Sequence, residues 1–142
     1  AHHHAGASLC CARHGDASGF FCSIDDVVCG DRIDHHLGVM HTLANPRLVG
    51  IDVVAHIGDA KVHVVHGPTT IDLSCAVGTT VGLVPIAGHV EGVTTAGLRW
   101  PLNDEQLVAW ASRGVSNVTT DERVHVRIQS GVLLVIIHEE KN

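Results

Sequence analysis

Residues 124–137 read Val-His-Val-Arg-Ile-Gln-Ser-Gly-Val-Leu-Leu-Val-Ile-Ile, and this stretch indicates a β protein. Over residues 124–128 apolar and polar side chains alternate with a period of two, as in a strand with one buried face. Residues 132–137 are apolar throughout, which is typical of a strand that is buried on both faces. The chain is therefore expected to finish with two strands of a packed sheet.

The same kind of pattern extends upstream as far as Gly50. Apolar stretches are separated by turn residues about every 8–12 positions, the spacing of a sandwich or a jelly roll. The expected strands cover residues 53–57, 61–66, 69–75, 80–85 and 89–95, with a turn at Gly88 and a further segment around 107–110. We therefore predict a mainly β fold, an antiparallel and jelly-roll-like β-sandwich of about 90 residues.

A short helical segment precedes the predicted sandwich. Over residues 34–45, Leu37, Met40 and Ala44 form an apolar stripe at helical spacing. Pro46 should end the helix, because proline disfavours the helical conformation in the residue before it. Residues 1–28 have no clear period, and we expect an irregular or truncated N-terminal segment there.

Composition excludes several classes of function. The 142 residues suffice for one domain, and the net charge of −6 without a basic run argues against nucleic-acid binding. The longest apolar runs are too short to span a bilayer, so no membrane partner is expected. Five cysteines, an odd number, with no secretory signal favour reduced thiols and a cytoplasmic protein.

The 13 histidines do not form a metal motif. His2, His3 and His4 look like the remnant of a purification tag, and neither a Cys-x-x-Cys pair nor a His-Glu-x-x-His helix occurs. The alternative is that residues 35, 36 and 41 meet a metal on one helical face, although exposed helical histidines are more common. We expect no metal site.

The segment Gly-Asp-Arg-Ile-Asp-His at residues 30–35 brings charged groups to the start of the helix. A guanidinium such as that of Arg32 offers planar contacts to phosphate, and Asp34 can hold Mg²⁺ or orient a hydroxyl. The alternative is that Asp31 or Asp34 caps the helix and takes part in a surface ion pair.

Two further segments carry groups suited to binding a ring. Trp100, within Gly-Leu-Arg-Trp-Pro-Leu at residues 97–102, offers a flat face for stacking, or is an ordinary core residue at a strand end. Ser116 and Asn117, within residues 112–117, offer a hydroxyl and an amide to the edge of a heterocycle, or simply form a turn.

Taken in order, these segments resemble the C-terminal half of the thiamin pyrophosphokinase (thiamine diphosphokinase) family. The resemblance rests on residues 30–35, 97–102 and 115–117, the strand at 124–128 and the ending at 131–136. It implies a transferase that moves the diphosphoryl group of ATP, bound with Mg²⁺, onto thiamin, giving thiamin diphosphate and AMP. It also implies a homodimer with active sites between an N-terminal α/β domain and a C-terminal β-sandwich.

The resemblance implies a role for each matching residue. Asp34 would orient or activate the thiamin hydroxyl, and Arg32 would contact phosphate. Ser116 and Asn117 would lie near the thiamin pyrimidine. Trp100 would contact the substrate or pack the wall of the site.

The chain departs from the family pattern upstream. The family's Asp-Gly-Gly, Gly-Asp-x-Asp-Ser and Thr-Asp segments, which supply most ligands of Mg-ATP, do not occur upstream of Asp34 in this sequence. We therefore expect residues 29–49 to be the remnant of the α/β nucleotide-binding domain and residues 50–142 to be the thiamin-binding sandwich. The alternative to an enzyme is a non-catalytic module for thiamin binding or dimerisation.

Overall fold

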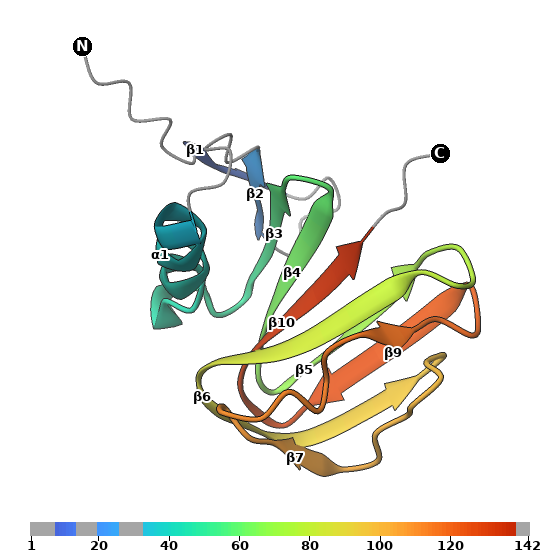
Figure 1. The fold of residues 1–142 in the computed structure, drawn as a ribbon. Helices are drawn as coiled ribbons and strands as arrows, with labels where there is room; N and C mark the ends of the chain where they lie inside the picture. Colours follow the sequence, from blue (N-terminus) through green and yellow to red (C-terminus); the bar gives the residue numbers. More distant parts are fainter. Residues whose placement is uncertain (1–7, 14–19, 26–32, 139–142) are drawn as a thin grey trace.

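A computed structural model describes residues 8–13, 20–25 and 33–138 (Figure 1). In that part of the chain one α-helix and one 3-10 helix accompany ten strands. The elements are β1 (Ser8–Arg13), β2 (Phe20–Asp25), α1 (Ile33–Leu43), η1 (Pro46–Leu48), β3 (Ile51–Ile57), β4 (Ala60–His66), β5 (Thr69–Ser74), β6 (Thr80–Ala96), β7 (Glu105–Leu107), β8 (Asn117–Val118), β9 (Arg123–Ile128) and β10 (Ser130–His138). No helix among the described residues has both the length and the apolar character needed to cross a membrane.

The strands form one curled sheet. Its order is β1-β2-β3-β4-β10-β6-β9-β5, and β7 and β8 also pair with β6. All of these pairs are antiparallel except β2 with β3, which is parallel. The prediction of a mainly β, antiparallel, sandwich-like fold with a short helix before it is confirmed.

Strand β6 joins the two layers of the curled sheet. Its first half, Thr80–Ile86, pairs with β10, and its last residues, Thr94–Ala96, pair with β9 (Figure 1). The predicted turn at Gly88 is wrong: Gly88 has φ 129° and Ala87 has φ 65°, so the strand bends there and continues. The bend lets one strand contribute to both layers, because it re-aims the backbone without ending the pairing.

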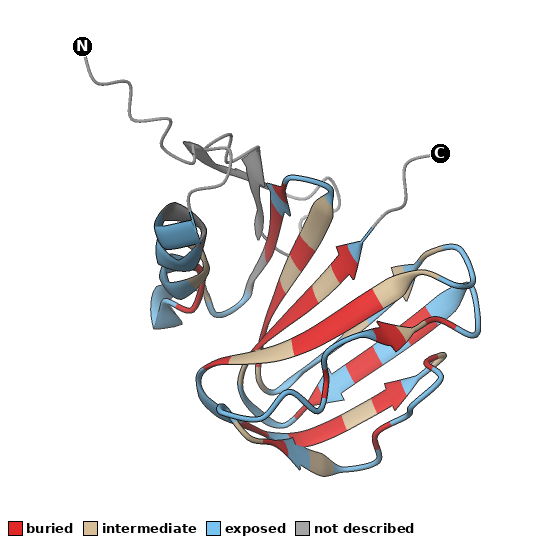
Figure 2. Cartoon of the chain, viewed as in Figure 1, coloured by how far each residue is buried: buried red, intermediate tan, exposed pale blue. Residues whose placement is uncertain are grey.

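Two apolar clusters lie on opposite faces of β10. Leu133, Val135 and Ile137 belong to the larger cluster, between the layers of the sandwich, whereas Leu134 belongs to the cluster beneath α1. Figure 2 shows β10 coloured mainly as buried or intermediate. The predicted burial of both faces of this strand is therefore confirmed. The predicted alternation in β9 is confirmed as well, because Val124, Val126 and Ile128 are buried and the residues between them are exposed.

Helix α1 packs on the face of β3, β4 and β10 that points away from the larger cluster. Leu43 and Ala44 are buried against this face, with Met40 partly buried beside them. The predicted apolar stripe is wrong at Leu37, which is 49% exposed. The helix ends at Leu43, two residues before the predicted end at Asn45.

The N-terminal part differs from its prediction. Residues 1–28 were expected to be irregular, but β1 and β2 lie within them and extend the sheet beyond β3. The segment expected around 107–110 is strand β7, which ends at Leu107.

Candidate functional site

The loop that carries Trp100 leaves the end of β6 and is held to the sandwich by backbone hydrogen bonds. The Arg99 N–H donates to the Val118 carbonyl over 2.8 Å, and the Thr120 N–H donates to the Gly97 carbonyl over 2.8 Å. Gly97 has φ +86°, and a Cβ there would lie 2.3 Å from the carbonyl oxygen of Arg123. A glycine is therefore required where the loop crosses β9.

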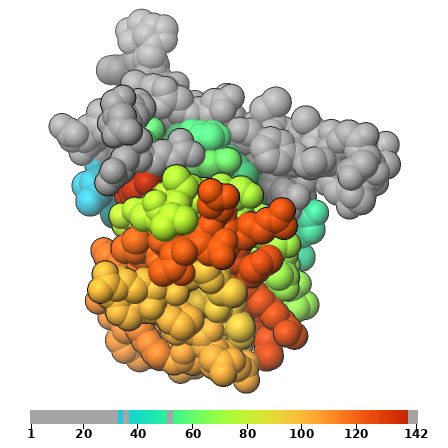
Figure 3. Space-filling model, turned by 90° about the vertical axis from the view of Figure 1, so that its right-hand side faces the viewer, coloured from blue at the N-terminus to red at the C-terminus, as the bar shows by residue number. Residues whose placement is uncertain are grey.

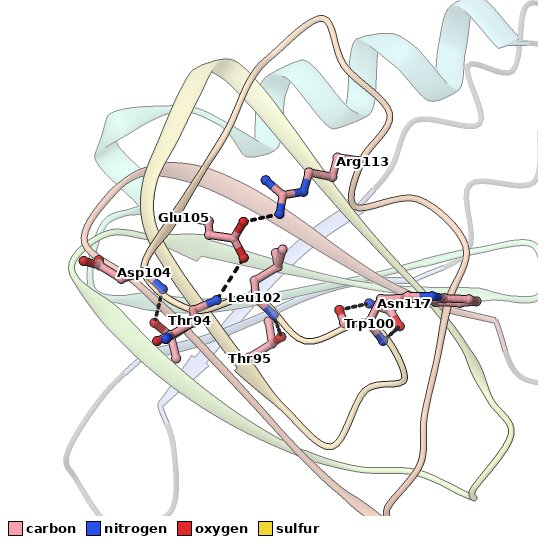
Figure 4. A network of polar contacts seen from close by, with 9 residues as sticks. Thr94, Thr95, Trp100, Leu102, Asp104, Glu105, Arg113 and Asn117 are labelled. Carbon is pink, nitrogen blue, oxygen red and sulfur yellow. Dashed lines mark hydrogen bonds and ion pairs between the residues drawn. The ribbon is translucent and has the colours of Figure 1, made fainter.

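Asn117 clamps the loop at Trp100 (Figure 4). Its Oδ1 accepts hydrogen bonds from the N–H groups of Trp100, at 3.1 Å, and Val118, at 2.9 Å. Its Nδ2 donates to the Trp100 carbonyl over 2.9 Å. Asn117 is 5% exposed, so these bonds satisfy groups that water does not reach. The amide oxygen is fully used, and one N–H of the side chain remains for a ligand.

The far end of the loop is tied to β6 by two threonines (Figure 4). Thr95 accepts the Leu102 N–H at its hydroxyl over 2.9 Å and donates its own N–H to the Leu102 carbonyl over 3.0 Å. Thr94 accepts the Asp104 N–H over 3.0 Å in the same way. The loop is therefore fixed at both ends.

Glu105 links this loop to the segment before Asn117. Its carboxylate accepts hydrogen bonds from the Asn103 N–H, at 3.1 Å, and from the Arg113 guanidinium. These bonds lower the pKa of Glu105, the Asn103 N–H contributing most and Arg113 next, because both stabilise the charged form. The carboxylate therefore stays ionised and holds Arg113 beside the loop.

A cavity of about 380 Å³ opens at this network. Residues 99–102, Arg113, Gly114 and Asn117 line it. Trp100 is 55% exposed, and the Cζ atom of Arg99 lies 5.0 Å from the centre of its ring. In Figure 3 the yellow-to-orange part of the chain, which includes these residues, forms much of the lower surface. The site thus combines an exposed aromatic ring with two guanidinium groups.

The structure brings together three of the five predicted site residues. Trp100 and Asn117 line the cavity, and Ser116 lies beside Asn117, exposed, with φ +64°. Asp34 lies in the first turn of α1, exposed and outside the cavity lining. Arg32 lies outside the described residues.

The sequence analysis missed three groups that build the site: Thr95, Glu105 and Arg113. Thr95 and Glu105 belong to no recognisable motif, whereas Arg113 lies within the segment 112–117 that carries Ser116 and Asn117. The available signal was their position, since Thr95 immediately precedes the segment 97–102 and Glu105 follows it closely.

A larger cavity of about 730 Å³ lies elsewhere, lined by Lys61, His63, residues 72–79 and Ile137. It contains none of the predicted site residues. Burial, and then the charges of Lys61 and His56, lower the pKa of His63 to about 4. Burial also raises the pKa of the Cys75 thiol. Both side chains are therefore uncharged near neutral pH, and Lys61 and Asp72 are the charged residue types in this lining. An exposed tryptophan ring beside two guanidinium groups occurs at the smaller cavity.

Metal ligands do not gather in the described part of the chain. There, no three side chains of His, Cys, Asp or Glu come together as they do around a metal ion. These residues alone therefore do not fit a magnesium centre.

Comparison with known proteins identifies relatives of the domain that carries this site. Residues 68–133 match the family model described as "Thiamin pyrophosphokinase, vitamin B1 binding domain". The curated protein Thiamine pyrophosphokinase 1 of Oryza sativa subsp. japonica is 26% identical over 113 residues, which are 75% of this chain and 41% of that protein. Thiamine pyrophosphokinase 3 of the same organism is 27% identical over 107 residues, covering 71% of this chain and 38% of that protein.

Solved structures share the fold. Thiamine pyrophosphokinase from Bacillus subtilis superposes with a TM-score of 0.69 at 19% identity, over 79% of this chain and 53% of that one. Thiamin pyrophosphokinase from Candida albicans gives 0.68 at 14% identity, over 82% of this chain and 44% of that one. The chain thus spans about two fifths of the curated relatives and about half of these structures.

Proposed function

Since the chain belongs to the thiamin pyrophosphokinase family, whose vitamin B1 binding domain it matches at residues 68–133, we propose that it supplies the thiamin site of a thiamine diphosphokinase. The reaction transfers a diphosphoryl group from ATP to thiamin. The thiamin hydroxyl oxygen forms a bond to the β-phosphorus of ATP, the bond from that phosphorus to the bridging oxygen breaks, and AMP leaves with that oxygen. The hydroxyl proton passes to a base.

The exposed ring of Trp100 carries this proposal. A side chain of this size normally gains stability by burial, yet the loop holds Trp100 with 55% of its surface in solvent. The hydrogen bonds from Asn117 fix its backbone, so the loop that carries the ring needs little further ordering on binding. A pyrimidine ring stacked on such an indole gains contact area and favourable ring–ring geometry.

The other predicted residues take the roles that their chemistry supports. Ser116 would donate or accept one hydrogen bond at the edge of the pyrimidine, and Asn117 would donate its remaining N–H. Asp34 would take the proton from the thiamin hydroxyl, and Arg32 would bind phosphate oxygens.

A homodimer would complete the site. In one chain α1 packs against the cluster on one face of β10, whereas the loop of Trp100 packs through Leu98 and Leu102 against the cluster on the other face. Asp34 of one subunit and Trp100 of another would meet if two copies place these faces together. ATP and Mg²⁺ would be held by an α/β nucleotide-binding domain, of which residues 29–49 would be the last part. We assign residues 50–142 to thiamin binding and the whole protein to the cytoplasm.

Calorimetric titration with thiamin tests the binding site. Trp100→Leu should abolish thiamin binding because it removes the stacking surface. Trp110→Leu is the matched control, since Trp110 is 82% exposed and packs edge-on against His89 outside the cavity lining. Retained thiamin binding in Trp100→Leu would contradict the proposed site.

Release of AMP from Mg-ATP distinguishes the enzyme from the alternative of a non-catalytic module. Thiamin-dependent AMP from the folded chain would establish the transferase. That alternative is a module for thiamin binding or dimerisation that transfers no diphosphoryl group. Thiamin binding without AMP release would support it.

A further inference from the structure

We propose that the 380 Å³ cavity beside Trp100 is an anion subsite, in which Arg99 binds the phosphate oxygens of a phosphorylated ligand. The identity of that ligand as a thiamin phosphate rests on the proposed function. The anion subsite itself does not, because an inorganic anion can probe it.

The side chains that line the cavity offer a ligand hydrogen-bond donors but no free acceptor. The one side-chain acceptor among them, Asn117 Oδ1, already accepts from two backbone N–H groups. The groups that remain are the guanidinium of Arg99, the unused N–H groups of Arg113, the Trp100 indole N–H and one N–H of Asn117. A ligand that only accepts hydrogen bonds, such as a phosphate or diphosphate group, matches this set.

The charge of the cavity also favours an anion, because it is positive. Arg113 is neutralised by Glu105, whose second carboxylate oxygen is held by the Asn103 N–H. Within the described part of the chain no carboxylate pairs with Arg99; its guanidinium contacts the face of the Trp100 ring. One uncompensated positive charge therefore remains in a chain whose net charge is −6.

The geometry suits a ligand with both a ring and an anionic group. A guanidinium presents a planar fork of N–H donors that fits phosphate oxygens in a bidentate manner. Arg99 lies over the Trp100 ring, at 5.0 Å from its centre, so an anion bound by Arg99 lies next to a ring stacked on that indole. The volume falls within the range of about 300–1,000 Å³ that is typical of small-molecule sites. A positive charge alone, such as a free thiazolium, is disfavoured beside Arg99.

Calorimetric titrations with inorganic pyrophosphate, thiamin and thiamin diphosphate test the inference. Arg99→Gln keeps a polar side chain but removes the charge and the guanidinium fork, and it should weaken pyrophosphate and thiamin diphosphate binding by about tenfold or more. Thiamin binding should not weaken. Arg99→Lys should restore part of the pyrophosphate affinity, because it restores the charge without the fork.

Arg127→Gln is the matched control, since Arg127 is an exposed arginine on β9 outside the cavity lining. Circular dichroism of each variant verifies the fold. Unchanged pyrophosphate binding in Arg99→Gln, or an equal loss in Arg127→Gln, would overturn the inference. Equal weakening of thiamin and thiamin diphosphate in Arg99→Gln would also overturn it.

The same titrations separate this inference from the proposed function. If pyrophosphate binds through Arg99 and thiamin does not bind, the anion subsite stands and the proposed function fails. If thiamin binds and pyrophosphate does not, the proposed function stands and the anion subsite fails.

Discussion

Replacing Asn117 by alanine should detach the loop that presents Trp100. The substitution removes three hydrogen bonds, two accepted by Oδ1 and one donated by Nδ2, at a residue that is 5% exposed. Each bond contributes about 0.5–1.5 kcal/mol net, and backbone groups left without a partner in a buried place cost more than the mean. We therefore expect a loss of about 3 kcal/mol in the free energy of unfolding, a large part of the roughly 5–15 kcal/mol of a small domain.

Urea unfolding measures this loss, and Ser116→Ala is the matched control. Ser116 is the neighbouring residue and is exposed, so its substitution should change the unfolding free energy by less than about 0.5 kcal/mol. Asn117→Asp should fall between the two, because it keeps the acceptor for both N–H groups but turns an oxygen toward the Trp100 carbonyl. In a Trp110→Phe background, the fluorescence of Trp100 should become more accessible to quencher in Asn117→Ala. Equal unfolding free energies for Asn117→Ala and Ser116→Ala would refute the clamp.

Three further predictions concern the scaffold. In the same urea assay, Gly97→Ala should lower the free energy of unfolding by about 3 kcal/mol or more, because the added Cβ would meet a backbone carbonyl at 2.3 Å. Gly78→Ala is the control: Gly78 has a similar φ of +89° but lies in open space, so its substitution should cost about 1 kcal/mol. Stability should fall as pH decreases from about 6.5 to about 4, because the unfolded chain then binds a proton that folded His63, with its pKa lowered to about 4, does not. The loss in unfolding free energy should be about 2 kcal/mol, because solvent screens part of the effect at this partly buried ring. The prediction is contradicted if the urea midpoint of the wild type does not change over this pH range. It is also contradicted if His63→Gln shows the same dependence of stability on pH. Leu43→Ala should lower the free energy of unfolding by about 3 kcal/mol, because Leu43 is fully buried. Leu37→Ala, on the exposed side of α1, should lower it by less than about 1 kcal/mol. Equal losses would mean that the helix packs by a different face.

Local periodicity predicted β9 and β10, because the order of apolar and polar residues within each strand shows which of its faces are buried. Strand β9 alternates because one of its faces is in the core, and β10 does not alternate because its two faces enter two different apolar clusters. The turn at Gly88 was predicted wrongly because a glycine that permits positive φ ends a strand in one context and bends it in another. The parallel pairing of β2 with β3 depends on a partner about 30 residues away, and nothing within β2 signals it.

The candidate site was predictable to the same extent. Trp100 and Asn117 stand in short motifs, so their importance could be inferred from the sequence, but their contact with each other could not. The two residues are 17 positions apart, and only the pairing of the loop with residues 117–120 brings them together. Thr95 and Glu105 could not be predicted for a similar reason. Their side chains accept hydrogen bonds from backbone N–H groups, and a backbone N–H carries no signal in the sequence.

The loop of Trp100 contains residues that stabilise the fold and a ring that does not. Leu98 and Leu102 are 5% and 6% exposed and anchor the loop in the core, while Trp100, midway between them, is turned outward. The hydrogen bonds of Asn117 reach only the backbone of Trp100, so they would form equally well with a small polar residue at that position. Packing and hydrogen bonding therefore account for Leu98, Leu102 and the backbone of Trp100, but not for the indole ring or for the Arg99 guanidinium beside it. An aromatic residue whose backbone is fixed by the scaffold and whose ring is left in solvent supports the proposal that a ligand stacks on that ring.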